Sequence, residues 1–279
     1  MMMQTLILPD GEPIDVLVQG QGTPLVLLHG WTSGPHIWMP FIDDLAAEYQ
    51  VIAWRARGHR PAPLQTATAM SLDQLVDDLH FMLEHFQIRH PVIVGHSMGA
   101  MLLWHYIRRF GSDHLRGVVI IDQSPCLLKK GDWPFAIYGH FDEAQNQALQ
   151  AEMRQNFAEA ALNLAARGLN PRITAAIEQD HPLIQQLRSY LGTLHAPALI
   201  QLWQDMTRQD WRDVPPTISV PVALLYGGKS QFYPVGVVQY LCEEMPQAQA
   251  TVFAEADHSP QLSAPDEFRA ALLSALRAM

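Results

Sequence analysis

Short, unbroken apolar runs alternate with amphipathic segments along most of the chain. The run 25–28, between Pro24 and Gly30, is typical of a strand buried on both faces of a sheet. Four further runs have the same character: 51–54, 92–94, 118–121 and 222–226. Apolar runs separated by helical segments predict an α/β fold, with a mostly parallel central sheet flanked by helices and right-handed crossovers.

Two other elements stand out in this pattern. Residues 71–86 place their apolar side chains on one helical face, and Ser71 followed by Gln74 predicts a capping box at the start of this helix. At the N-terminus, residues 4–8 and 14–18 flank a turn and predict a β-hairpin.

The alternation stops after Asp122. From 126 to 214 the sequence is helix-rich, with no strand-like run, and strand character returns only at Val220. We therefore expect residues 1–125 and 215–279 to form the α/β core. Residues 126–214 are expected to form a helical cap on the carboxyl edge of the sheet.

Composition narrows the class of protein. The 279 residues carry a net charge of −10 with scattered Lys and Arg, which argues against nucleic-acid binding. No run approaches the roughly 18 apolar residues of a membrane span, and no secretory signal is visible. Two cysteines, Cys126 and Cys242, suit a reducing compartment. We expect a cytoplasmic monomer or homodimer.

The segment 92–100, Val-Ile-Val-Gly-His-Ser-Met-Gly-Ala, contains a G-x-S-x-G motif between an apolar strand and a helix start. A strand that turns sharply into a helix holds Ser97 in strained backbone and exposes its hydroxyl above the sheet edge, and Gly95 and Gly99 remove side chains that would clash there. The helix N-terminus favours a developing oxyanion. Ser97 is therefore the predicted nucleophile, and an idle serine in a glycine-rich turn is the alternative.

A serine nucleophile needs a base and an orienting acid. His258 lies in the loop after a predicted last strand, 250–253, and is the predicted base. Asp122 ends the run 118–121 and is the predicted acid, with a capping aspartate as the alternative. Asp257 adjoins His258 and is poorly placed to reach its ring.

The tetrahedral intermediate of acyl transfer needs backbone donors for its oxyanion. The amide of Met98, next after the nucleophile, is one predicted donor. The amide of Trp31, in the loop after the first central strand, is the other, with Gly30 allowing the close approach. His29 is interpreted as an anchor of that loop.

These landmarks resemble the α/β-hydrolase superfamily over essentially the whole chain. In that superfamily the histidine follows the last strand, and the acid most often follows the penultimate one. Here the loop 225–233 has no carboxylate and Ser230 stands at the expected place, so the resemblance implies an acid one strand earlier, at Asp122. The segment Arg57-Gly58-His59 resembles the family's structural Arg-Gly-x-Gly loop, with an arginine in place of its second glycine.

Within the superfamily the chain is similar to the branch of serine esterases, enol-lactonases and cofactor-free haloperoxidases. This resemblance implies hydrolysis of a carboxylic ester or lactone of a small to medium hydrophobic substrate through an acyl-enzyme. The shifted acid is shared with cofactor-independent dioxygenases. The alternative is therefore oxygenation of a hydroxyquinolone-like aromatic, with His258 and Asp122 as the base.

The remaining motifs indicate no metal and no cofactor. His80 and His85 are five residues apart, about 140° around a helix, and cannot share a metal as i,i+4 ligands do. In the predicted cap, Trp133, Tyr138 and Trp203 either line an apolar substrate pocket or pack helices together, and the sequence leaves both possibilities open.

Overall fold

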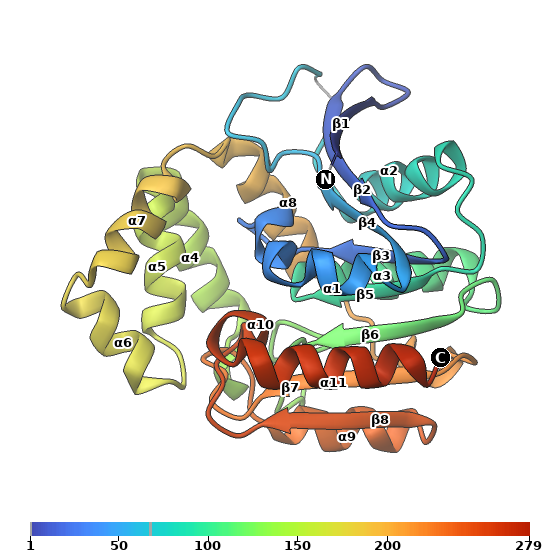
Figure 1. The fold of residues 1–279 in the computed structure, drawn as a ribbon. Helices are drawn as coiled ribbons and strands as arrows, with labels where there is room; N and C mark the ends of the chain where they lie inside the picture. The colour runs from blue at the N-terminus through green and yellow to red at the C-terminus, as the bar shows by residue number, and fades with distance from the viewer. Residues whose placement is uncertain (1, 67–68) are drawn as a thin grey trace.

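An eight-stranded sheet organises residues 2–66 and 69–279, which are the residues that the computed structural model describes (Figure 1). The strand order is β1-β2-β4-β3-β5-β6-β7-β8. The strands are β1 (Met2–Ile7), β2 (Pro13–Gln19), β3 (Thr23–Leu28), β4 (Tyr49–Arg55), β5 (Val92–His96), β6 (Gly117–Ile121), β7 (Val222–Gly227) and β8 (Ala248–Phe253). Only β1 with β2 and β2 with β4 pair antiparallel among these strands, and the other pairs are parallel. The predicted mostly parallel sheet is confirmed.

Helices cover both faces of the sheet because alternate strand residues point to opposite sides. In β3, Val26 and Leu28 belong to one apolar cluster, whereas Leu25 and Leu27 belong to another. The helices outside the 122–214 segment are η1 (Pro35–Phe41), α1 (Ile42–Ala46), α2 (Leu72–His85), α3 (Met98–Phe110), η3 (Pro215–Thr217), α9 (Gly236–Glu244), α10 (Pro260–Ser263) and α11 (Pro265–Arg277). The first cluster includes residues of α2, α3 and α9, and the second includes residues of α1 and α11.

The predicted hairpin and the predicted helix 71–86 are both present. β1 and β2 pair in register with Leu6 opposite Ile14. At the start of α2 the Ser71 hydroxyl accepts from the Gln74 amide over 3.1 Å, which is half of the predicted capping box. The Gln74 side chain instead donates to Asp78 Oδ1 over 3.0 Å, because that buried carboxylate also needs donors.

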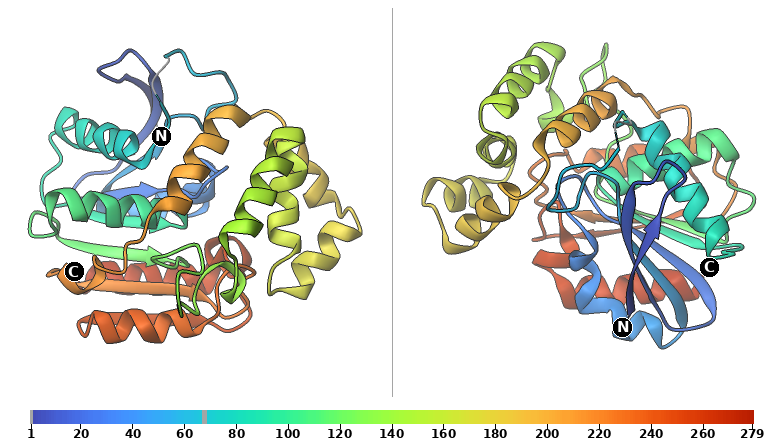
Figure 2. Two further views of the ribbon diagram at one scale, coloured as in Figure 1. Left: turned by 180° about the vertical axis from the view of Figure 1, so that it is seen from behind. Right: turned by 90° about the horizontal axis from the view of Figure 1, so that it is seen from above.

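Between β6 and β7 the chain contains helices and no strand in residues 122–221. These helices are η2 (Ile137–Gly139), α4 (Glu143–Gln155), α5 (Phe157–Ala166), α6 (Pro171–Glu178), α7 (Pro182–Leu191) and α8 (Ala196–Arg208), followed by η3. In Figure 1, α4 to α7 stand beside the sheet at the end toward which the arrows of β6 and β8 point. Both views of Figure 2 show the same four helices projecting from the body of the sheet, with α8 leading back toward it.

The loop after β4 is held by buried polar groups. The Arg57 guanidinium, fully buried, donates to Asp78 over 2.8 Å and to Asp10 over 2.7 Å. Two buried histidine rings pack against each other beside it, those of His29 and His59, with centroids 4.8 Å apart. Burial lowers the pKa of His59 to about 4, and burial together with the neighbouring His59 lowers the pKa of His29 well below its usual value.

These neutral histidines predict acid sensitivity. Because His59 has a pKa of about 4 when folded and an ordinary value near 6.5 when unfolded, only the unfolded chain takes up its proton between these pH values. The free energy of unfolding therefore falls as pH decreases from 6.5 toward 4, by up to about 1.4 kcal/mol per pH unit for this residue. Urea unfolding of the wild type and of His59→Asn at pH 7, 6 and 5 measures the effect. The variant is expected to show the shallower dependence on pH, and identical slopes would contradict the prediction.

Candidate active site

Three parallel strands bring Ser97, Asp122 and His258 to one edge of the sheet. Ser97 follows β5, Asp122 follows β6 directly, and His258 lies in the loop after β8. The carboxyl ends of parallel strands meet at one edge, which is where open α/β sheets bind ligands. The backbone N–H of Ser97 donates to the Ile121 carbonyl over 3.1 Å and ties the first two strand ends together.

The turn at Ser97 has the strained geometry that its sequence predicts. Ser97 has φ 53° and ψ −117°, and α3 begins at the next residue, Met98. A Cβ atom on Gly95 would lie 2.5 Å from the Gly99 carbonyl oxygen, and one on Gly99 would lie 2.3 Å from the Leu28 carbonyl oxygen. Both glycines are therefore required for the helix and strand to approach so closely.

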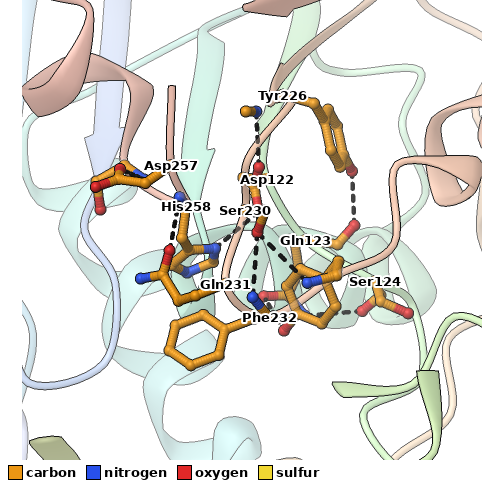
Figure 3. Close-up of polar contacts among 12 residues, drawn as sticks. Asp122, Gln123, Ser124, Tyr226, Ser230, Gln231, Phe232, Asp257 and His258 are labelled. Carbon is orange, nitrogen blue, oxygen red and sulfur yellow. Dashed lines mark hydrogen bonds and ion pairs between the residues drawn. The ribbon is translucent and has the colours of Figure 1, made fainter. Parts of the chain in front are cut away.

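Asp122 is hydrogen-bonded to His258 in the interior (Figure 3). Asp122 Oδ1 lies 2.8 Å from His258 Nδ1, and the Asp122 side chain is 0% exposed. Its two oxygens also accept from the Gly227 amide over 2.8 Å and from the Ser230 hydroxyl over 2.7 Å. Because an ionised carboxylate only accepts, Nδ1 of His258 carries the proton and Nε2 has a free lone pair. The ring is therefore in the tautomer that a general base requires.

The backbone of His258 is held on both sides. Its N–H donates to Gln231 Oε1 over 3.1 Å, and its carbonyl oxygen accepts from His96 Nε2 over 2.9 Å. The ring of Phe232 packs edge-on against the His258 ring, with centroids 4.6 Å apart. Burial, with a smaller contribution from the nearby His258, lowers the pKa of His96 to about 3. His96 is therefore a neutral neighbour of the His258 ring.

The carboxylate of Asp257, next to His258 in the chain, has other partners. Asp257 Oδ1 accepts from the Ser259 amide over 2.8 Å and from the Ser263 hydroxyl over 3.0 Å, within its own loop. This arrangement agrees with the expectation that Asp257 is poorly placed to reach the neighbouring ring.

The loop after β3 approaches Ser97 closely. A Cβ on Gly30 would lie 3.3 Å from Ser97 Cβ, so the Gly30–Trp31 peptide borders the serine. Met98 is the first residue of α3, and its N–H has no acceptor within the helix. His29 anchors the loop, because its Nδ1 donates to the Gly30 carbonyl over 2.8 Å and its Nε2 accepts from the Ala56 amide over 3.0 Å.

A cavity of about 380 Å³ opens above Ser97 and His258. Its lining includes the loop residues Trp31 and Phe232 and apolar side chains of α5, α6 and α7. The apolar residues from these three helices include Leu162, Leu164, Ala165, Ile173, Ile177, Ile184 and Leu187. The described residues around this cavity include no lysine and no arginine.

Of the three predicted cap residues, only Trp203 lines this cavity. Its ring lies 5.0 Å from that of Trp31, and its N–H donates to Asn146 Oδ1 over 2.9 Å. The sequence left open whether Trp133 and Tyr138 line a pocket or pack helices together, and neither is among the residues that line this cavity. Both are buried, and the polar atom of each side chain donates to a backbone carbonyl.

Both residues have partners in the interior. The Trp133 N–H donates to the Cys126 carbonyl over 3.0 Å, and its ring packs against Tyr240 with centroids 4.9 Å apart. The Tyr138 hydroxyl donates to the Leu164 carbonyl. Burial raises the pKa of Tyr138 well above its usual value.

Sequence reasoning placed Ser230 where the acid is usual but gave it no role, and it missed Gln231 and the apolar cavity residues of α6 and α7. For Ser230 and Gln231 the sequence offers only a loop without a carboxylate. The apolar spacing of Ile173, Ile177 and Ile184 was a usable signal, since it marks an amphipathic face in a segment with few buried residues.

Over residues 2–66 and 69–279, no group of three or more His, Cys, Asp or Glu side chains is placed to hold a metal ion. In the same ranges, none of the helices is long and apolar enough to cross a membrane. Cys126 and Cys242 are both free thiols.

Comparison with known proteins supports this architecture. A family model described as alpha/beta hydrolase fold matches residues 23–265. A pimeloyl-[acyl-carrier protein] methyl ester esterase from Aeromonas hydrophila is 27% identical over 252 residues, covering 89% of this chain and 93% of that protein. An esterase from Exiguobacterium antarcticum has a TM-score of 0.85 at 20% identity, covering 99% of this chain and all (100%) of that one. A bromoperoxidase from Bacillus anthracis has a TM-score of 0.84 at 22% identity, with 99% and 100% covered. The fold predicted from the sequence is confirmed.

The close approach at Gly99 predicts a large effect of one methyl group. Gly99→Ala places a Cβ against the Leu28 backbone oxygen, which cannot move without distorting β3, and is expected to lower the free energy of unfolding by about 3 kcal/mol or more. Gly192→Ala is the matched control, because its new Cβ would meet its nearest atom at 3.4 Å and its φ is −66°. Denaturant unfolding should leave this control near wild type. Equal stabilities of the two variants would contradict the packing argument.

Proposed function

Because the chain belongs to the α/β-hydrolase fold family, we infer that it is a hydrolase acting on carboxylic ester bonds, and we propose that it uses Ser97 as nucleophile. The observation that carries the proposal is the arrangement of three side chains. Ser97 and His258 line one cavity, and the His258 ring is hydrogen-bonded to the buried Asp122. We propose further that residues 126–214 act as the cap that closes this cavity.

The proposed reaction begins with attack of Ser97 Oγ on the carbonyl carbon of the ester. His258 Nε2 takes the hydroxyl proton, while Asp122 orients the ring and stabilises the imidazolium. The amides of Trp31 and Met98 donate to the oxyanion of the tetrahedral intermediate. His258 then gives the proton to the leaving alcohol. Water, deprotonated by the same histidine, hydrolyses the acyl-enzyme and releases the acid.

The walls of the cavity favour a small to medium hydrophobic ester or lactone. Apolar residues of the cap and the absence of lysine and arginine among its described lining residues suit a neutral, apolar acyl or aryl group. Its volume of about 380 Å³ lies within the range of small-molecule sites. The curated relatives named as pimeloyl-[acyl-carrier protein] methyl ester esterases also act on an ester.

Ser97→Ala tests the nucleophile. The wild type is expected to hydrolyse short p-nitrophenyl esters and to be labelled by a fluorophosphonate probe. The variant should lose labelling and about 10⁴-fold or more in kcat, because no other group can form the acyl-enzyme. Absence of both hydrolysis and labelling in the wild type would overturn the esterase proposal. Oxygen uptake with a hydroxyquinolone would then favour the dioxygenase alternative.

Ala165→Leu tests the acyl site. Ala165 lies on α5 and lines the cavity, so a larger side chain should exclude long acyl chains. The ratio of kcat/KM for p-nitrophenyl octanoate to that for the acetate is expected to fall about tenfold or more. Ala166→Leu, on the same helix but outside the cavity lining, is the control and should keep the wild-type ratio. An unchanged ratio in both variants would mean that the acyl chain lies elsewhere.

A further inference from the structure

Ser230 has no step of its own in the proposed reaction, yet its hydroxyl lies at the centre of the polar network (Figure 3). Its Oγ donates to Asp122 Oδ1 over 2.7 Å, and Asp122 Oδ1 also accepts from His258 Nδ1 over 2.8 Å. The Ser230 side chain belongs to a residue that is only 6% exposed. Water is therefore a poor substitute for this contact.

The direction of the Ser230 hydroxyl is fixed by its other contacts. Its oxygen accepts from the amides of Phe232 over 3.3 Å and of Tyr233 over 3.4 Å. With its lone pairs engaged by two N–H groups, the hydroxyl hydrogen is left to point at the carboxylate. Ser230 is thus held as a donor to Asp122.

Two donors at one carboxylate oxygen determine the plane of the carboxylate. The terminal torsion of an aspartate is broad, so packing alone holds it loosely. The Gly227 amide holds Oδ2, and Ser230 together with His258 holds Oδ1. Without the hydroxyl, Oδ1 keeps its hydrogen bond to the histidine, and small rotations of the carboxylate would carry the imidazole ring with them.

We infer that Ser230 is a positioning residue for the His258–Asp122 pair. The inference rests on the proposed function. Ser230 reaches the carboxylate because Asp122 and Ser230 follow β6 and β7, which are adjacent parallel strands.

The first test compares two side chains of the same shape at position 230. Ser230→Thr keeps the hydroxyl, whereas Ser230→Val replaces it with a methyl group. We expect S230V to lower kcat for p-nitrophenyl esters about tenfold with little change in KM, and S230T to stay within about twofold of wild type. Equal kcat in the two variants would overturn the positioning role.

The pH profile separates positioning from simple packing. Loss of the donor leaves more negative charge on Asp122, which stabilises the imidazolium, so the acid limb of kcat/KM should move to higher pH in S230V and not in S230T. The other titratable side chains that contact the His258 ring, His96 and Tyr233, are unchanged in both variants. A profile that does not move in S230V would indicate a packing role alone.

A substrate-independent signal distinguishes failure of this inference from failure of the proposed function. The proton on His258 Nδ1 lies in a short buried hydrogen bond, and its NMR resonance should shift in S230V and remain in place in S230T. A shift without any esterase activity in the wild type would reject the proposed function and keep the coupling of Ser230 to the pair. An esterase abolished by Ser97→Ala but with the resonance unmoved in S230V would reject the inference alone. Should S230V fail to fold, Ser230→Ala makes the same comparison.

Discussion

One buried negative charge, the carboxylate of Asp122, constrains the structure around it. A carboxylate without contact to solvent costs several kcal/mol unless protein donors replace its water. Here the donors are the Gly227 amide, the Ser230 hydroxyl and the His258 ring. They come from the end of β7, the loop after it and the loop after β8. The order β6-β7-β8 therefore serves this charge as well as the sheet, because it brings the three donors to one point.

Backbone strain lies at the same strand ends. Ser97 and Asp122 both follow their strands with positive φ, 53° and 42°, where non-glycine residues are uncommon and cost about 1 to 3 kcal/mol. Hydrogen bonds to the next strand hold each of them: Ser97 N–H donates to the Ile121 carbonyl and Asp122 N–H to the Leu225 carbonyl. The hydrogen bonds between strands thus continue beyond the end of each strand, while the side chain lies at the edge of the sheet. Strain at these two residues is offset by the completed sheet.

The strands and the positions of Ser97 and Asp122 could be predicted from the sequence for the same physical reason. Runs such as 92–94 and 118–121 are apolar throughout because both faces of each strand are buried, and the residues that follow such a run lie at the sheet edge. Ser97 and Asp122 could be located from their own neighbours in the chain.

The sequence predicted that residues 126–214 are helical, but not which of their side chains face the cavity. Whether Trp133, Tyr138 or Trp203 faces the cavity depends on how α4 to α8 pack, and a burial pattern is the same for a core tryptophan and a pocket tryptophan. The contact between Ser230 and Asp122 could not be predicted for a related reason. Its function depends on a partner 108 residues away, and a serine in a polar loop has no distinctive local pattern.

The neutral state of His96 completes the electrostatic arrangement of the proposed reaction. At rest Asp122 is stabilised by dipoles and by a neutral imidazole, and the imidazolium formed in the transition state becomes its counter-ion in a site of low dielectric, where charge interactions are strong. A second cation beside His258 would oppose that step. His96 lies 5.0 Å away ring to ring, but burial holds its pKa near 3, so it donates to the His258 carbonyl without adding charge. The histidine in the Gly-His-Ser-Met-Gly motif thus fixes the base in space and leaves its protonation to Asp122.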